Sequence, residues 1–114
     1  MKRLAPLLLV ACTSAAPADP SCPSIDASAC QTPIPSYSAE IVPILDMRCN
    51  RTCHAPGVGP WPLTTYDDVH DWTTIIGAYV ESCGMPPPDA GLGDMTQGER
   101  VTVMNWLACG APNN

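Results

Sequence analysis

The stretch Cys49-Asn50-Arg51-Thr52-Cys53-His54 places two thiols and an imidazole close together in the chain. Three residues separate the two cysteines, and the histidine directly follows the second one. Sulfur and imidazole nitrogen are ligands of transition metals. A cysteine beside a histidine in sequence does not establish a nucleophile and base in contact, so a hydrolase is not supported. The stretch therefore indicates a metal or cofactor site.

The residues before this stretch predict a helix from Ser38 or Glu40 to Cys49. Ser38 is a suitable N-cap, and Glu40 suits the positive first turn. Apolar residues then recur at helical spacing on the face that includes Cys49. Pro43 fits near the start of such a helix or at a kink. This helix would bring Cys49 to the apolar side of the domain.

After the motif, residues 55–62 contain Gly57, Gly59 and prolines, which predict a sharply turning loop. Trp61 is the large apolar residue of this loop, and it suits either core burial or the edge of a cofactor. A second helical stretch starts at the cap Thr65 and runs to Cys83, as one helix or as two broken near residues 72–74. Within it, His70 lies among aspartates and is expected on the surface.

The last helix has the clearest signals. Thr96 and Glu99 form a capping box, and Gly110 followed by Pro112 ends the helix. Between the second and the last helix lies Gly84-Met85-Pro86-Pro87-Pro88, whose prolines exclude a helix and favour a stiff extended segment. Such a segment can hold one side chain, that of Met85, in a fixed place. The pattern as a whole predicts an all-α domain over residues 37–114.

The N-terminus has the features of a targeting segment. Lys2 and Arg3 precede a short apolar run that is too short to span a bilayer. Residues 9–12, Leu-Val-Ala-Cys, resemble the lipobox of bacterial lipoproteins. Residues 1–11 are thus expected to be a lipoprotein signal peptide, with Cys12 lipidated and the protein anchored in the bacterial cell envelope, on its periplasmic or outer-membrane face. The alternative is an ordinary signal peptide cut after Ala15 or Ala16.

Residues 12–36 are rich in Pro, Ala, Ser and Thr, and we expect them to form a disordered, extended tether. Cys22 and Cys30 lie in this segment. In an oxidising compartment they are expected to close a small disulfide loop, although free or metal-binding thiols remain an alternative.

The charge of the chain restricts its partners. After residue 11, the basic residues are Arg48, Arg51 and Arg100, against all 11 acidic residues of the 114-residue chain. A chain without a basic patch cannot neutralise phosphates, so nucleic acid is excluded as a partner. An anionic lipid surface would repel the domain, which leaves the lipid anchor as its membrane contact. A partner protein with a basic face would be attracted.

Taken together, these motifs resemble a small single-haem cytochrome c domain. The features shared with the bacterial secreted or lipoprotein type are the Cys/His motif, Met85-Pro86-Pro87, Thr96 with Glu99, and Trp106 followed by Gly110-Ala111-Pro112. In the attachment motif of a c-type haem, the second cysteine also precedes the histidine. The resemblance covers about residues 37–113 and implies three to four helices around a haem pocket.

The resemblance also implies a role for each site residue. Cys49 and Cys53 would form the haem thioethers, and His54 and Met85 would be the axial iron ligands. The other methionines, Met47, Met95 and Met104, are weaker candidates for the second ligand, because two lie in predicted helices and one in a loop.

In the implied fold the helices that carry Cys83 and Cys109 end near each other, which suggests a disulfide between them. The implied function is that of a one-electron carrier with one haem c, rather than an enzyme, that exchanges electrons with a partner protein.

The spacing departs from the family. Two residues usually separate the cysteines, so the third residue here must bulge out of the turn. Two alternatives follow. A cytochrome-like fold without haem could pair Cys49 with Cys53 and serve as a disulfide-stabilised surface lipoprotein with a binding or structural role. A zinc site could instead use Cys49, Cys53, His54 and one further thiol.

Overall fold

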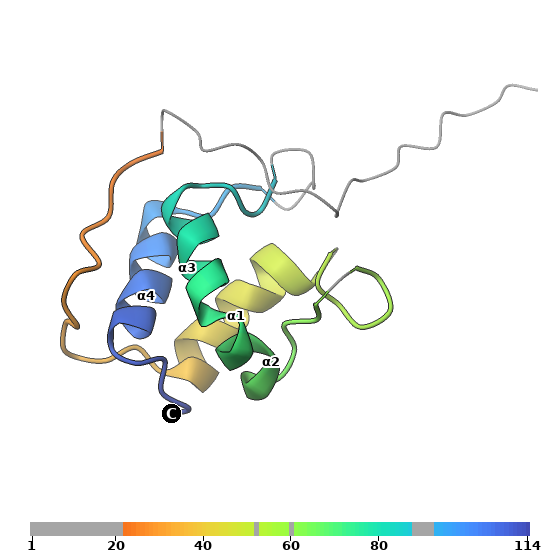
Figure 1. The fold of residues 1–114 in the computed structure, drawn as a ribbon, viewed down its shortest axis with the longest axis horizontal. Coiled ribbons are helices and arrows are strands. Elements are labelled where there is room, and N and C mark those ends of the chain that lie inside the picture. Colours follow the sequence, from red (N-terminus) through yellow and green to blue (C-terminus); the bar gives the residue numbers. More distant parts are fainter. Residues whose placement is uncertain (1–21, 52, 60, 88–92) are drawn as a thin grey trace, which may run out of the picture.

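The computed structural model describes residues 22–51, 53–59, 61–87 and 93–114 (Figure 1). Within these residues the regular elements are all helices, which confirms the predicted all-α class. They are η1 (Tyr37–Ile41), α1 (Val42–Leu45), η2 (Asp46–Asn50), α2 (Tyr66–Asp71), α3 (Thr73–Glu81) and α4 (Gln97–Ala108). None of the helices in these ranges is both long and apolar enough to cross a bilayer.

The first three elements form one helical run, with wide π-type turns in η1 and η2 at its two ends. The predicted N-cap Ser38 is wrong, since Ser36 caps the run. The Ser36 hydroxyl accepts from the Ala39 N–H at 3.2 Å, and Glu40 accepts from the Ser36 N–H at 2.7 Å. These two bonds provide acceptors for N–H groups that otherwise have no hydrogen-bond partner at the start of a helix.

The middle of the chain forms two helices, α2 and α3, with a break at Trp72. Thr65 caps α2 by accepting from the Asp68 N–H at 3.2 Å, as its sequence predicts. Both bonds of the predicted capping box at the start of α4 are present. The Thr96 hydroxyl accepts from the Glu99 N–H at 3.1 Å, and Glu99 accepts from the Thr96 N–H at 3.0 Å.

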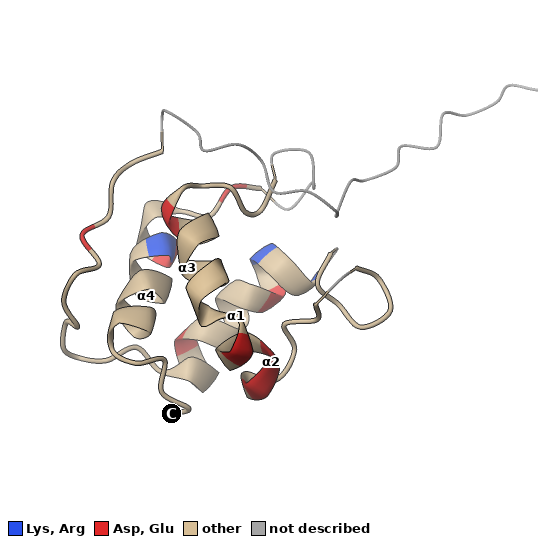
Figure 2. Ribbon diagram, in the orientation of Figure 1, with Lys and Arg blue, Asp and Glu red and all other residues tan. Residues whose placement is uncertain are grey.

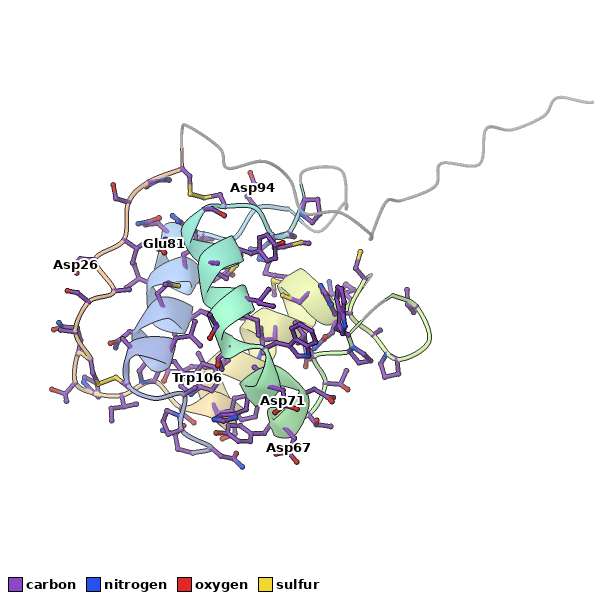
Figure 3. All side chains as sticks on the ribbon, viewed as in Figure 1. Asp26, Asp67, Asp71, Glu81, Asp94 and Trp106 are labelled. Atoms are coloured by element: carbon purple, nitrogen blue, oxygen red, sulfur yellow. A yellow bond between two sulfur atoms is a disulfide. The ribbon has the colours of Figure 1, made fainter. Side chains whose placement is uncertain are left out.

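Helix α4 packs against α3 and η1, and its Trp106 is completely buried (Figure 3). The Trp106 ring stacks on Tyr37 with 5.6 Å between centroids, and Tyr66 meets Tyr37 edge-on at 5.1 Å. Trp106 also donates from Nε1 to the Pro112 carbonyl at 3.0 Å. These aromatic contacts join the two ends of the domain, and Tyr66 adds a bond of 2.7 Å to the Ala111 carbonyl.

The segment 22–36 lies along the helices without helical structure of its own (Figure 1). Disulfides join Cys22 to Cys83 and Cys30 to Cys109. The predicted pairing of Cys22 with Cys30 and of Cys83 with Cys109 is therefore wrong, although all four cysteines are in disulfides. These two bonds attach this part of the expected tether to the domain.

Arg100 fixes the same segment from within the domain. It is 3% exposed, and its guanidinium donates to the carbonyls of Val80 (3.0 Å), Glu81 (2.8 Å) and Pro23 (2.9 Å). Two of these carbonyls lie at the C-terminal end of α3, where a cation is favoured. Arg100 thereby holds α3, α4 and the N-terminal segment together.

Candidate cofactor-binding site

A single apolar cavity of about 270 Å³ brings the motif and the Met85 segment together. Its walls come from the end of α1, η2, the loop after the motif, α3 and the segments before and within α4. The lining residues are Leu45, Cys49, His54, Trp61, Leu63, Trp72, Ile75, Ile76, Tyr79, Val80, Met85, Met95 and Val103. Its volume lies just below the usual range of ligand pockets, about 300–1,000 Å³.

A narrow second hollow adjoins the motif. Arg48, Cys49, Cys53, His54, Met85, Pro86 and Pro87 line it. The structure thus brings together the four residues that the resemblance implied as haem ligands and attachment points. Both hollows are lined by Cys49, His54 and Met85. Cys53 lines the narrow hollow but not the larger cavity.

The imidazole of His54 is oriented by a backbone carbonyl. Its Nδ1 lies 2.8 Å from the Trp61 carbonyl oxygen. A carbonyl can only accept, so Nδ1 carries the proton in this bond, and in the neutral ring the lone pair is on Nε2. Metal-bound histidines generally donate their other ring N–H in this way, which fixes the tautomer and the ring orientation.

The extra residue of the motif is accommodated by a wide turn. The His54 N–H donates to the Cys49 carbonyl at 3.0 Å, a bond between residues five apart. With two intervening residues the same pair would be four apart, as in an α-helix. Wide turns of this kind are frequent at functional sites. The bond keeps the first cysteine and the histidine together despite the longer spacing.

The loop after the motif returns closely to it. A Cβ at Gly59 would collide with the Cys53 carbonyl, so this close approach needs glycine. The Leu63 N–H donates to the His54 carbonyl at 3.1 Å, which closes the loop against the histidine. This return places the Trp61 carbonyl beside the imidazole.

The two motif cysteines differ in state. Cys49 is the free thiol among the described cysteines, and burial raises its pKa to about 12. Loss of water around the sulfur disfavours the thiolate, so this thiol is neutral at neutral pH. Cys53 is buried and disulfide-bonded, and its sulfur can form another bond only after that disulfide is reduced.

The four methionines considered as iron ligands differ in whether they line the cavity. Met104 is a buried core residue and Met47 is 44% exposed, and neither lines the cavity. Met85 and Met95 both line it, and Met85 also lines the narrow hollow with Cys53. The Met85 backbone is held by the end of α3, since its N–H and that of Gly84 donate to the Tyr79 carbonyl.

The mouth of the cavity is apolar and partly exposed. Trp61 is 56% exposed, so core burial of this residue is wrong, and its ring lies 5.1 Å from that of Trp72. Ile75 and Tyr79 of α3 are also exposed and line the cavity.

Acidic side chains lie on α2, the helix that ends directly before Trp72. Asp67 and Asp71 project from α2 (Figures 2 and 3), and His70 beside them is exposed, as its acidic surroundings predicted. Arg48 forms an ion pair with Glu99 at 2.9 Å, and Arg100 is buried. Of the three arginines after residue 11, Arg51 is the exposed one.

Among the described residues, no group of three or more His, Cys, Asp or Glu side chains could hold a metal ion. The zinc alternative therefore gains no support from them. The expected signal peptide and the lipidation of Cys12 lie outside the described residues. Comparison of the chain with protein-family models, with curated proteins and with solved structures gives no match.

Proposed function

We propose that this protein is a one-electron carrier with one covalently attached c-type haem, anchored by lipid at Cys12 outside the cytoplasm. The observation that carries the proposal is the cavity, which gathers Cys49, His54 and Met85 between apolar walls. A thiol, an imidazole and a thioether are the groups that a covalently bound haem with two axial ligands requires. Apolar walls suit the faces of a porphyrin.

The residues present fit the group in three respects. His54 has the tautomer that leaves its lone pair on Nε2, as an iron ligand needs. Cys49 has a free thiol beside the cavity. Met85 is tethered by its backbone to α3, which limits where its sulfur can lie. A thioether at Cys53 would require that a thiol reductant first supplies two electrons to cleave the disulfide of this sulfur, after which the free thiol could add to a haem vinyl group.

Each residue then has a physical task. Cys49 and Cys53 would hold the haem in place, and His54 and Met85 would bind its iron from two sides. Bound haem supplies the reversible change between Fe(II) and Fe(III). Apolar residues such as Leu45, Ile76 and Val80 would exclude water, which together with a thioether ligand raises the reduction potential.

The partner we propose is a redox protein with a basic face. Among the arginines after residue 11, Arg100 is buried and Arg48 is paired with Glu99, so the outer surface carries mainly acidic charge. A basic partner would be attracted over a distance of about 10 Å at moderate salt.

A second candidate has its own support. Two disulfides cross-link the N-terminal segment to α3 and α4, and the sulfur of Cys53 is also in a disulfide. A disulfide-stabilised surface lipoprotein without haem, with a binding or structural role, is compatible with these bonds. In that case the cavity would have another apolar ligand or none. The pairing of Cys49 with Cys53 that this alternative included is wrong, because Cys49 has a free thiol.

An absorption spectrum separates the two candidates. The chain is exported in a host that has haem-attachment machinery, purified, and extracted with acid–acetone. The proposal predicts a Soret band that stays with the protein, and its loss in Cys49→Ser together with Cys53→Ser. A colourless protein from a host that loads a reference cytochrome c favours the haem-free lipoprotein.

A further inference from the structure

Asn50 is a buried amide between the two cysteines of the motif, with 7% of its surface exposed. Its Nδ2 donates to the Leu63 carbonyl at 2.6 Å and to Asp46 Oδ1 at 3.1 Å. Its Oδ1 is buried without a hydrogen-bond donor among the described residues. An unpaired buried oxygen lowers stability, so the gain at this position must come from the amide donor.

The bonds of Asn50 lead to the histidine in two steps. Leu63, whose carbonyl Asn50 holds, donates from its own N–H to the His54 carbonyl at 3.1 Å. Two residues earlier, the Trp61 carbonyl accepts from His54 Nδ1 at 2.8 Å. Asn50 therefore anchors the end of the loop whose carbonyl fixes the imidazole. The wide turn that accommodates the extra motif residue, closed by the bond from the His54 N–H to the Cys49 carbonyl, includes Asn50.

We propose that Asn50 is a positioning residue that sets the tautomer of His54. By holding the Leu63 carbonyl, it keeps the Trp61 carbonyl in place, so that the proton stays on Nδ1 and the lone pair on Nε2. The purpose of this arrangement, binding of iron, rests on the proposed function. The tautomer itself is a property of the chain without haem and can be measured there.

A merely structural asparagine would behave differently. Its loss would lower the free energy of unfolding and leave the imidazole unchanged in the molecules that remain folded. Asn105 provides the matched control, because it also bridges backbone groups. It accepts from the Gln31 N–H at 2.7 Å and donates to the Gln31 carbonyl at 3.0 Å, at the N-terminal segment.

The test is two-bond ¹H–¹⁵N correlation NMR of the full chain without haem, at a pH where both histidines are neutral. The protein has two histidines, so His70→Gln assigns the signals. Wild type is expected to show the Nδ1–H form of His54. Asn50→Ala should shift it to a mixture of both tautomers, whereas Asn105→Ala should not. If Asn50→Ala does not fold, Asn50→Asp keeps the shape but cannot donate to Leu63.

An unchanged His54 tautomer in a folded Asn50 variant overturns the proposal, whatever the haem content. In haem-loaded protein, a weaker bond from Nδ1 makes the imidazole a poorer donor to iron, so Asn50→Ala should raise the midpoint potential. The same shift in Asn105→Ala would show that loosened packing, rather than the bond at His54, causes it, and would contradict the proposal. If wild type binds no haem but the tautomer shifts, the positioning role stands and the proposed function fails.

Discussion

A disulfide joins Cys22 of the N-terminal segment to Cys83, two residues before Met85. Figure 3 shows a disulfide where this segment meets the end of α3. The second disulfide, Cys30–Cys109, lies at the end of α4. The two disulfides therefore differ in their surroundings. Cys22–Cys83 is close in sequence to Met85, which lines the cavity, whereas Cys30–Cys109 is not.

This difference gives the first prediction. Replacing either disulfide by two serines should lower the free energy of unfolding by about 2–5 kcal/mol, because each closes a long loop. In haem-loaded protein, only Cys22→Ser with Cys83→Ser should also weaken the bond from Met85 to iron. Urea unfolding and the red-edge absorption band measure the two effects. Equal loss of the band in Cys30→Ser with Cys109→Ser would contradict this account.

The second prediction separates the two methionines of the cavity. Met85→Ala in haem-loaded protein should lower the reduction potential, because a thioether ligand raises it. Met95→Ala removes a similar apolar side chain from the same cavity and should keep the sulfur-to-iron band. Redox titration and absorption spectra decide between them. If Met95→Ala loses the band and Met85→Ala keeps it, the assignment of the ligand is wrong.

The third prediction concerns Arg100. Removal of its guanidinium leaves the carbonyls of Val80, Glu81 and Pro23 without this donor. The bond to Val80 is buried and the other two are partly buried, and a buried group that loses its partner costs about 1–3 kcal/mol. Arg100→Ala should therefore lower the free energy of unfolding by roughly 3 kcal/mol. Arg51→Ala, at an exposed position, should change it by about 0.5 kcal/mol or less. Similar losses in both variants would argue against the role of Arg100.

The fourth prediction follows from the Cys49 thiol in the protein without haem. Burial raises its pKa from 9.0 to about 12, so the folded state keeps a proton that the unfolded state loses. The contribution of this thiol to the free energy of unfolding is therefore complete below pH 9, and it falls as the pH rises from 9 towards 12. The slope from this group approaches about 1.4 kcal/mol per pH unit.

The Cys49→Ala variant isolates this contribution, because Tyr37, whose pKa is also raised by burial, titrates in both proteins. The measurement is the difference in unfolding free energy between the two proteins across that pH range. Iodoacetamide should also modify native Cys49 slowly at pH 9. Parallel stability curves, or rapid labelling of the native protein, would show that the thiol is not protected.

Local signals determined much of the fold. Thr65, Thr96 and Glu99 act over one helical turn, so their caps could be predicted from neighbouring residues. The N-cap at Ser36 was missed because Ser38 has the same chemistry. Both hydroxyls donate to the Asn114 carbonyl at the far end of the chain, and the Ser36 hydroxyl also accepts from the Ala39 N–H. A contact with the far end of the chain is not visible in a local pattern.

In the candidate site too, some features could be predicted from neighbouring residues, and others depend on contacts between distant parts of the chain. The motif and Met85 were recognisable as chemical groups, and the structure brings them to one cavity. The disulfide pairing was not predictable, because it depends on the path of residues 22–36 across α3 and α4. Buried Asn50 and Arg100 were also missed. Both bond to carbonyls distant in sequence, and such partners have no local signature.

The most direct test of the central claim is the intact mass of the exported chain from a host with haem-attachment machinery. The account predicts that wild type is heavier than its polypeptide by one haem after denaturation, and that Cys49→Ser with Cys53→Ser lacks this added mass. Denaturation removes haem that is merely bound in the cavity, so the remaining mass reports covalent attachment. A wild-type chain with no haem mass, from cells that load a control cytochrome c, would contradict the account.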